Sequence, residues 1–273
     1  MNYQKISAAA EEVVRQAGAF IRGEFGKVSQ QSIEEKSVNQ LVSYVDRTAE
    51  EMLVKGLRQI LPEATFLTEE ATIAAESSAL QWIIDPLDGT TNFLYNLPVF
   101  AVSVALREAE QTVVGIVYEV NRDECFHACL GGGARLNGDP IRVGNADTLA
   151  KALVGTGFPV DNFSRLTPHL KATSHFIQNS RGVRRMGSAA TDLAYVACGR
   201  FDGFYEYNLN AWDLAAGALL VLEAGGAISD FSGGDNYVFG KELLATNGKI
   251  HEQMQNVING AFYPTMPSGS GKF

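Results

Sequence analysis

Two carboxylates that follow a short apolar segment are the residues of this sequence best suited to chemistry. Asp85 and Asp88 stand three positions apart, directly after the segment Trp82–Ile84. Pro86 cannot donate a hydrogen bond to a neighbouring strand, so we expect strand pairing to stop there. Gly89 then permits a tight turn, because glycine has no Cβ atom. The pattern predicts a strand that ends in two acids beside a sharp turn.

The residues after this turn favour a helix start that can bind an anion. Thr90, Thr91 and Asn92 are residue types found at helix N-termini, where backbone N–H groups bind phosphate oxygens. Two adjacent carboxylates would repel a phosphate unless divalent cations lay between them, and Mg²⁺ prefers carboxylate and phosphate oxygens. The alternative is a capping turn with a solvated acid pair. The strand end, the glycine and the two threonines favour the phosphate site.

Three further acidic positions could join this site. Glu69–Glu70 follows an apolar segment and, taken alone, indicates a solvated pair in a loop. Asp213 opens a predicted helix over residues 212–224 that is otherwise almost wholly apolar, which is typical of a helix cap. Asp46 stands where a second helix would have its N-cap. If the Asp213 end faces the first two aspartates, their like charges require cations.

Other polar residues allow less specific interpretations. Cys125, His127 and Cys129 alternate along a predicted strand and so share one face, as ligands of a soft metal would. No fourth ligand is evident, which favours simple packing. Arg184–Arg185 could contact a substrate phosphate or a partner subunit, or form a solvated pair. We expect three histidines without a partner pattern to lie on the surface or to cap helices: His169, His175 and His251.

The first half of the chain is expected to combine two helices with an antiparallel meander. Apolar residues at spacings of three and four predict helices over about 6–21 and 46–61, the second ended by Pro62. Asn137-Gly138 indicates a two-residue hairpin turn. Four strands are predicted at hairpin spacing, over residues 82–84, 99–106, 112–120 and 124–130.

From about residue 150 the pattern changes to alternating strands and helices. Strands are predicted at 153–157, 204–207 and 243–245, and helices at 162–178, 188–197 with Ser188 as N-cap, 212–224 and 251–258. We expect one domain over residues 1–273, with two halves at about 1–148 and 149–262. Residues 263–273 are rich in Pro, Gly and Ser and predict a flexible tail.

Composition narrows the class of protein. The chain has 273 residues, 46% hydrophobic and 19% charged, which is typical of a folded globular protein. Its net charge of −9 disfavours binding to nucleic acid or to anionic membranes, but not to metal cations. Three cysteines form no even framework and indicate free thiols in a reducing compartment. We find no export signal or membrane span, and expect a cytoplasmic protein.

Several of these segments occur together in an order and at separations that carry a family resemblance: Glu69–Glu70, Trp82–Phe93 and Trp212–Gly226. Together they resemble the inositol monophosphatase family, and the two long motifs are highly specific. The resemblance runs from about residue 36 to residue 251 and includes Leu41–Asp46, Gly187–Ala190 and Glu206. The loop Gly155–Pro159 resembles bacterial members of the family and is expected to border the substrate.

The resemblance implies a fold and a chemistry. The fold is of the α/β (α+β) class, a five-layer αβαβα sandwich, and the reaction is hydrolysis of a phosphate monoester with two to three Mg²⁺ ions. Glu69, Asp85 and the carbonyl of Leu87 would hold the first ion. Asp85, Asp88 and Asp213 would hold the second, and Glu69 a weaker third.

The resemblance also assigns roles around the substrate. Gly89 and Thr90 would donate to the phosphate, Asp46 would hydrogen-bond Thr90, and Thr90 with Glu69 would orient the attacking water. The alcohol part of the substrate would be lined by four residues: Asp88, Ala189, Glu206 and Asp213. Family members are often homodimers and are commonly inhibited by Li⁺, so the expected partners are a small phosphorylated polyol and a second copy of the chain.

The expected substrate is inositol 1-phosphate. Thr90–Phe93 is similar to the inositol phosphatase branch, whereas enzymes for 3′-phosphoadenosine nucleotides tend to have Lys-Glu in place of Thr91-Asn92. Glu206 favours a polyol, because a carboxylate accepts hydrogen bonds from ring hydroxyls. Histidinol phosphate, fructose 1,6-bisphosphate and a nucleotide 3′-phosphate remain alternatives.

Alternatives from other classes are weaker. No G-x-S-x-G motif supports serine hydrolysis, and a phosphoaspartate mechanism of the D-x-D type needs acids two positions apart. An inactive phosphatase-like protein with a binding or regulatory role would be expected to lack at least one key residue. All five are present, which favours the enzyme: Glu69, Asp85, Asp88, Thr90 and Asp213.

Overall fold

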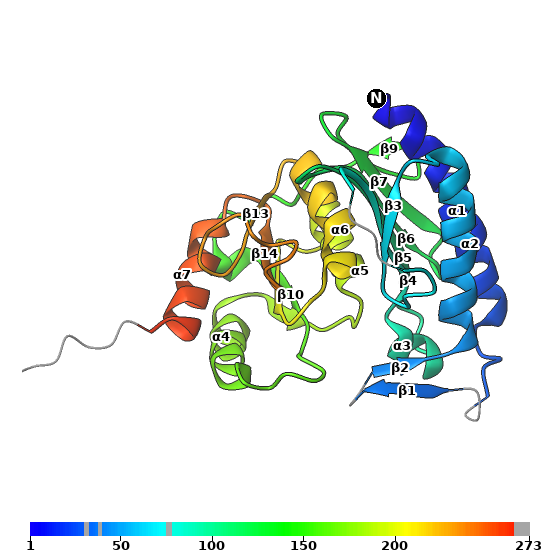
Figure 1. The fold of residues 1–273 in the computed structure, drawn as a ribbon. Helices are drawn as coiled ribbons and strands as arrows, with labels where there is room; N and C mark the ends of the chain where they lie inside the picture. Colours follow the sequence, from blue (N-terminus) through cyan, green and yellow to red (C-terminus); the bar gives the residue numbers. More distant parts are fainter. Residues whose placement is uncertain (30–32, 38–39, 75–77, 265–273) are drawn as a thin grey trace, which may run out of the picture.

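The computed structural model arranges the chain in five alternating layers of helices and sheets (Figure 1). It describes residues 1–29, 33–37, 40–74 and 78–264. The layers are, in order across the molecule, α1 (Tyr3–Glu24) with α2 (Tyr44–Ile60), a seven-stranded sheet, α5 (Ala189–Ala197) with α6 (Ala211–Glu223), a five-stranded sheet, and α4 (Leu166–Asn179) with α7 (His251–Phe262). The expected αβαβα sandwich of the α/β (α+β) class is confirmed.

The seven-stranded sheet contains the predicted meander. Its strands lie in chain order, and only the first pair is parallel. Asn137 and Gly138 have φ values of 49° and 90° and form the predicted two-residue turn. The strands are β3 (Thr65–Thr68), β4 (Leu80–Asp88), β5 (Ala101–Glu108), β6 (Gln111–Glu119), β7 (Glu124–Cys129), β8 (Ala134–Leu136) and β9 (Asp139–Pro140).

Strand β4 differs from the expectation that pairing stops at Pro86. Asp85 lies opposite Ser103 on β5. Asp88, three positions further along β4, lies opposite Ala101, only two positions further along β5. Two residues of β4 therefore face one residue of β5, which is a β-bulge. Proline has no N–H to donate, so the ladder is interrupted where predicted, but it resumes at Asp88.

Helices α1 and α2 cover the outer face of this sheet with their predicted apolar stripes. The N-cap of α2 is Ser43, which corrects the expectation for Asp46. Ser43 Oγ accepts the Val45 N–H at 3.1 Å, and Asp46 Oδ2 accepts the Ser43 N–H at 2.9 Å. The two residues form a capping box. Asp46 thus lies in the first turn of the helix and is buried.

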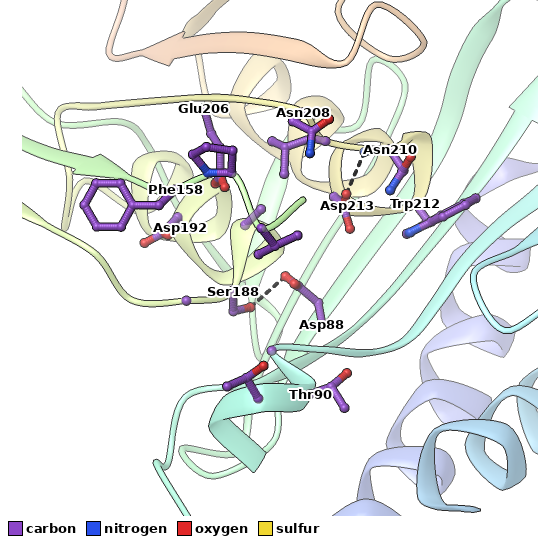
Figure 2. Close-up of a pocket in the computed structure, with 18 of the residues that line it drawn as sticks. Asp88, Thr90, Phe158, Ser188, Asp192, Glu206, Asn208, Asn210, Trp212 and Asp213 are labelled. Atoms are coloured by element: carbon purple, nitrogen blue, oxygen red, sulfur yellow. Dashed lines mark hydrogen bonds between the residues drawn. The ribbon is translucent and has the colours of Figure 1, made fainter. Parts of the chain in front are cut away.

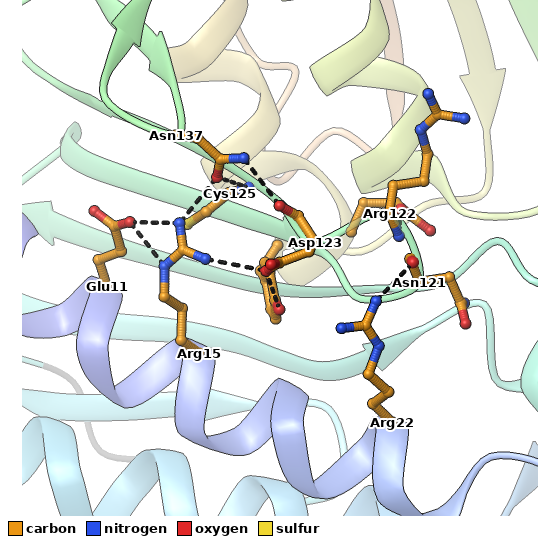
Figure 3. Close-up of polar contacts among 10 residues, drawn as sticks. Glu11, Arg15, Arg22, Asn121, Arg122, Asp123, Cys125 and Asn137 are labelled. Atoms are coloured by element: carbon orange, nitrogen blue, oxygen red, sulfur yellow. Dashed lines mark hydrogen bonds and ion pairs between the residues drawn. The ribbon is translucent and has the colours of Figure 1, made fainter.

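Polar contacts join α1 to the connections between strands (Figure 3). Arg15 donates to Asp123 at 3.2 Å, in the connection between β6 and β7, and to Asn137 at 2.9 Å, in the turn between β8 and β9. Arg22 donates to the carbonyl of Asn121 at 2.7 Å. These contacts are exposed, so each contributes little stability alone, but together they fix the helix along the sheet.

Helices α5 and α6 lie between the two sheets, which explains why they are apolar on almost every side. Ser188 is the predicted N-cap of α5, and its Oγ accepts the Thr191 N–H at 3.3 Å. Helix α6 is capped by Asn210 rather than by Asp213. Asp213 lies in the first turn and accepts the Asn210 N–H at 2.7 Å.

The five-stranded sheet carries α4 and α7 on its outer face. Its order is β11 (Gly182–Arg184), β10 (Leu153–Thr156), β12 (Gly203–Tyr207), β14 (Glu242–Thr246) and β13 (Ala227–Ser229). Helix α4 begins at Leu166 and not at Asn162 as predicted. Asn162 Oδ1 instead accepts the Ser164 N–H at 3.1 Å, a local turn that competes with helix formation.

His169 lies inside the apolar face of α4, which corrects the prediction of a surface residue. Neither ring nitrogen has a hydrogen-bond partner among the described residues. Burial lowers the pKa of His169 to about 4. His175 is exposed, as predicted, whereas His251 hydrogen-bonds Thr246 and Ser229. The His169 ring packs against four other rings, those of Phe158, Tyr205, Tyr207 and Phe262.

Short elements complete the fold: β1 (Glu34–Ser37) pairs with β2 (Gln40–Val42), α3 (Thr90–Leu94) follows β4, and a 3-10 turn spans Leu149–Lys151. All three cysteines are free thiols, as predicted. In the described ranges, no helix has both the length and the apolar character needed to cross a membrane. From residue 265 onward, the expected flexible tail lies outside the described residues.

Candidate active site

One pocket gathers residues of both halves of the chain (Figure 2). It encloses about 180 Å³ between the start of α3, the start of α6 and the loop that follows β10. Asp46, Asp85 and Leu87 are buried close to it. Its lining includes most of the predicted site residues: Glu69, Asp88, Gly89, Thr90, Ala189, Glu206 and Asp213. Gly157–Pro159, part of the loop that the sequence predicts to border the substrate, also lines this pocket.

Three aspartates meet at this pocket, where Asp88 and Asp213 line it and Asp85 is buried next to them. Asp85, Asp88 and Asp213 each place a carboxylate oxygen within 4.8 Å of the others. Burial raises the pKa of Asp85 well above its ordinary value, and the charges of Glu69, Asp88 and Asp213 raise it further. Burial likewise raises the pKa of Asp88 to about 6. The fold thus holds like charges together, which a cation would stabilise.

Local hydrogen bonds fix the direction of each aspartate. Asp85 Oδ1 accepts the Leu87 N–H at 2.9 Å within the β4 bulge. Asp88 Oδ2 accepts from Ser188 Oγ and from the Ala190 N–H, both at 2.7 Å. The N-cap of α5 is therefore tied to the end of β4, although these two elements are far apart in the chain. The Asn210 N–H holds Asp213 in the same manner.

The donor set fits a hard divalent cation. All the clustered groups are carboxylate oxygens, the class that Mg²⁺ and Ca²⁺ prefer, and hydrogen bonds hold them in place before any ion binds. Glu69 lines the same pocket and acts electrostatically on all three aspartates. The Leu87 carbonyl oxygen lies 3.0 Å from Thr90 Oγ1 and competes with Asp46 for its one proton, and a carbonyl oxygen has lone pairs for an ion.

Thr90 connects the pocket to the start of α2. Its Oγ1 lies 3.0 Å from Asp46 Oδ1, so the hydrogen bond that the family resemblance implies is present. Asp46 also accepts from the N–H and the hydroxyl of Ser43, at 2.9 Å and 2.8 Å. Burial raises the pKa of Asp46, while its hydrogen bonds with Ser43 and Thr90 oppose that rise. The capping box of α2 thereby orients a hydroxyl of the same pocket that Asp88 and Asp213 line.

Gly89 gives α3 its geometry at the pocket. Its φ of 96° lies in the left-handed region, and a Cβ atom there would be 3.0 Å from the Val99 carbonyl oxygen. The N–H groups of the first helical turn have no partner within the helix. They start beside the aspartate cluster, as the sequence predicts for a site that binds a phosphate group.

Glu50 is a site residue that sequence reasoning missed. It is fully buried on α2, and its carboxylate accepts the Glu70 N–H at 2.7 Å and the Thr72 N–H at 2.8 Å. The Thr72 hydroxyl adds a third bond at 2.7 Å. Glu50 thus holds the loop that carries Glu69. Its position one turn after Asp46, within the apolar stripe of the helix, was the signal that could have revealed it.

The far end of the pocket holds a second group of charges. Burial and the charge of Asp88 raise the pKa of Glu206 to about 8, against the charge of Arg185. Asp192, which the sequence did not indicate, also lines this end, and its pKa is raised well above the ordinary value by burial and by Glu206. Arg185 lines the pocket as well, whereas Arg184 is exposed at the edge of the sheet.

Known proteins resemble this chain over almost all of its length. The Nus factor SuhB of Escherichia coli K12 is 41% identical over 246 residues, which cover 90% of this chain and 92% of that protein. The Nus factor SuhB of Pasteurella multocida is 43% identical over 224 residues, which cover 82% and 84%.

Solved structures show the same fold. The extragenic suppressor protein suhB of Bartonella henselae has a TM-score of 0.86 at 38% identity, over 90% of this chain and 95% of that one. The inositol monophosphatase of Anabaena (Nostoc) has a TM-score of 0.85 at 34% identity, over 96% and 98%. The family model described as the inositol monophosphatase family matches residues 2–262. The chain is a member of the inositol monophosphatase family, and these relatives confirm the resemblance to its bacterial members.

Proposed function

We propose that this protein is a Mg²⁺-dependent phosphatase that hydrolyses a small polyol phosphate monoester, with inositol 1-phosphate as the leading substrate. The observation that carries the proposal is the aspartate cluster. Three carboxylates lie within 4.8 Å in one pocket, beside a helix start whose N–H groups suit a phosphate. A metal that binds there would lie next to a phosphate, which is the arrangement that metal-assisted phosphoryl transfer requires.

The proposed ions number two to three. Glu69, Asp85 and the carbonyl of Leu87 would hold one, Asp85 with Asp88 and Asp213 a second, and Glu69 a weaker third. When bound, Mg²⁺ supplies a water nucleophile at neutral pH and offsets the charge of the phosphoryl oxygens. The protein contributes the fixed carboxylates that select a hard cation.

The remaining residues would position water and phosphate. The N–H groups of Gly89 and Thr90 would donate to phosphate oxygens. Asp46 accepts the Thr90 hydroxyl proton at 3.0 Å, which leaves lone pairs of Thr90 Oγ1 to accept a proton from the attacking water. Glu69 would accept the other proton of this water, so that its oxygen is directed at phosphorus.

The alcohol part of the substrate would lie at the far end of the pocket, between Asp88, Ala189, Glu206 and Asp213. Carboxylates accept hydrogen bonds from hydroxyl groups, which favours a polyol. Histidinol phosphate, fructose 1,6-bisphosphate and a nucleotide 3′-phosphate remain the alternative substrates. We also propose a homodimer, which sedimentation equilibrium of the full chain would test.

Phosphate release from a substrate panel tests the proposal. The panel is inositol 1-phosphate, histidinol phosphate, fructose 1,6-bisphosphate and 3′-phosphoadenosine 5′-phosphate, each with Mg²⁺, with Mg²⁺ and Li⁺, and with EDTA. We expect Mg²⁺-dependent, Li⁺-sensitive release with a preference for inositol 1-phosphate. Preference for another substrate would move the substrate assignment and keep the mechanism. A lack of release from every substrate would refute the phosphatase.

A second candidate function is a binding role that does not require catalysis. The observation that favours it is the name of the relatives at 41% and 43% identity, which are called Nus factors. The test is a gene replacement with Asp88→Asn in the organism that carries this protein. Full replacement of the wild-type gene by this variant would assign the cellular role to binding. A loss equal to that of a deletion would assign it to catalysis. The expectation that nucleic acid is not a partner stays a prediction.

A further inference from the structure

Asp192 is a buried carboxylate at the far end of the pocket for which the proposed reaction has no use (Figure 2). It lies on α5 three positions after Ala189, and i and i+3 positions of a helix share a face. Asp192 is only 1% exposed, and its Oδ1 has no hydrogen-bond partner among the described residues. A buried acceptor without a partner destabilises the folded protein, so a ligand that donates to it would be stabilising.

The neighbouring protein groups do not provide that donor. Glu206 and Asp88 face Asp192 as like charges. Arg185 is the opposing charge, but it also acts on Asp88 and Glu206, and it does not hydrogen-bond Oδ1 of Asp192. One cation therefore faces three carboxylates. None of the described residues donates a hydrogen bond to Asp192 Oδ1.

Gly157 holds Glu206 at the same end. A Cβ atom on residue 157 would come within 2.0 Å of both carboxylate oxygens of Glu206. The carboxylate thus lies directly against the backbone of the loop that follows β10. Phe158, the next residue, also lines the pocket at this end (Figure 2). Asp192 and Glu206 are consequently two acceptors fixed on two different elements at one end of the pocket.

We infer that Asp192 is a specificity-determining residue, which together with Glu206 accepts hydrogen bonds from neighbouring hydroxyl groups on the alcohol part of the substrate. The inference rests on the proposed function, because it concerns the same pocket and reaction. A phosphate ester with hydroxyl groups at this end satisfies both acceptors. An ester without them leaves two buried carboxylates unpaired, and such sites discriminate strongly against the analogue that lacks the donor.

The experiment compares two substrates in three forms of the full-length protein with Mg²⁺. The substrates are inositol 1-phosphate and p-nitrophenyl phosphate, which has no hydroxyl groups. The proteins are wild type, Asp192→Ala, which removes both acceptor oxygens, and the control Asp139→Ala, which makes the same change at an exposed position of β9. For Asp192→Ala we expect kcat/KM for inositol 1-phosphate to fall by about tenfold to a hundredfold, mainly through KM, while kcat/KM for p-nitrophenyl phosphate stays within about threefold. Asp139→Ala should match wild type on both.

The outcomes separate this inference from the proposed function. An equal fall for both substrates, or no fall for inositol 1-phosphate, would overturn the role of Asp192 and leave the phosphatase intact. Wild-type hydrolysis of p-nitrophenyl phosphate alone would overturn polyol selection and keep the metal chemistry. An absence of hydrolysis of either ester by the wild type would refute the proposed function itself.

A second measurement needs no variant and so does not depend on whether Asp192→Ala folds. Wild-type protein is assayed with inositol 1-phosphate and with its single-deoxy analogues. The inference predicts that two neighbouring hydroxyl groups, and not isolated ones, each contribute about tenfold or more to kcat/KM. The inference would be overturned if no deoxy analogue had a lower kcat/KM than inositol 1-phosphate itself. A preference for an ester with an ammonium group at this end would instead assign the two carboxylates to a cation.

Discussion

Asp88 accepts hydrogen bonds from Ser188 and from the Ala190 backbone while its carboxylate lies among like charges. An asparagine would keep an oxygen in place for these two donors and would remove the negative charge. We therefore expect Asp88→Asn to lower the phosphatase rate with Mg²⁺ by about a hundredfold or more, because changes to mere neighbours of metal ligands already cost about tenfold to a hundredfold.

The same variant should not be less stable than wild type when no metal is present. Its melting temperature in EDTA is expected to equal or exceed that of wild type, because one like charge is gone from the cluster. Phosphate-release assays and thermal melts check both parts, with Asp139→Asn as the control. Full activity would refute the metal role of Asp88, and a large fall in melting temperature would mean that its carboxylate is structural.

At the residue scale, the sequence predicts those groups that stand in a recognisable motif. Asp85, Asp88 and Asp213 belong to long, specific segments, and the structure brings these three together. Glu50 and Asp192 were missed because a single acid in a helix normally indicates a solvated side chain. The place of Glu50 within the apolar stripe of α2 was a sequence signal for its burial, whereas the burial of Asp192 follows only from the packing of α5 between the two sheets.

At the element scale, the loop that carries Glu69 depends on helix α2. Glu50→Gln would replace one carboxylate oxygen by an NH₂ group, so either the Glu70 N–H or the Thr72 pair loses its acceptor. We expect the Mg²⁺ concentration for half-maximal activity to rise by about tenfold to a hundredfold, with a smaller change in the maximal rate. Titration of activity with Mg²⁺ measures this, and Glu51→Gln is the exposed control on the same helix. An unchanged Mg²⁺ dependence would show that Glu50 only stabilises the loop.

Helix α4 carries a pH-dependent contribution to stability. His169 has a pKa of about 4 in the folded protein, against an ordinary value of 6.5. The unfolded chain thus binds a proton more readily, so the stability contribution is complete above pH 6.5 and is lost as the pH falls towards 4, by up to about 3 kcal/mol. His169→Leu should weaken this loss.

Urea unfolding between pH 7.5 and pH 4 tests this contribution. The exposed His175→Leu on the same helix serves as the control and should follow wild type at every pH. Identical slopes of unfolding free energy against pH for wild type and His169→Leu would show that acid acts on other groups.

The predicted elements succeeded where periodicity is long and failed where local chemistry overrides it. Helices α1 and α2 and strands β5 to β7 follow their apolar patterns closely. Strand β3 was not predicted, because its four residues are too few for a reliable apolar pattern. The start of α4 was predicted too early, because Asn162 forms its own turn with Ser164. Asp46 and Asp213 both resemble N-caps, but each lies inside a capping box.

At the scale of the whole molecule, the aspartate cluster joins the two halves of the chain. Asp85 and Asp88 come from the seven-stranded sheet, and Asp213 comes from the helical layer between the sheets. A cation that binds all three therefore links these layers, and binding to the folded state alone stabilises it. We propose accordingly that the two halves unfold as one unit.

Metal removal tests this coupling. At a Mg²⁺ concentration of about one hundred times the dissociation constant we expect a gain of about 2.7 kcal/mol, which corresponds to roughly 5–10 °C in melting temperature for a domain of this size. Differential scanning calorimetry with Mg²⁺ and with EDTA measures the shift. Asp88→Asn should show a much smaller shift. Two separate transitions, of which Mg²⁺ moves only one, would contradict a single unit.

The bulge in β4 has a consequence for how this site could be recognised or rebuilt. Side chains of a regular strand alternate between its two sides, so an odd interval such as that between Asp85 and Asp88 would send them to opposite sides. The extra residue of the bulge compensates for this odd interval. The residues opposite Asp85 and Asp88 on β5, Ser103 and Ala101, are two positions apart and so lie on one side of the sheet. The two carboxylates of this D-x-x-D therefore lie on the same side of the sheet, as those of a D-x-D in a regular strand would. A one-residue deletion that also erased the bulge would preserve the side of Asp88, whereas a one-residue insertion into a regular strand would reverse it.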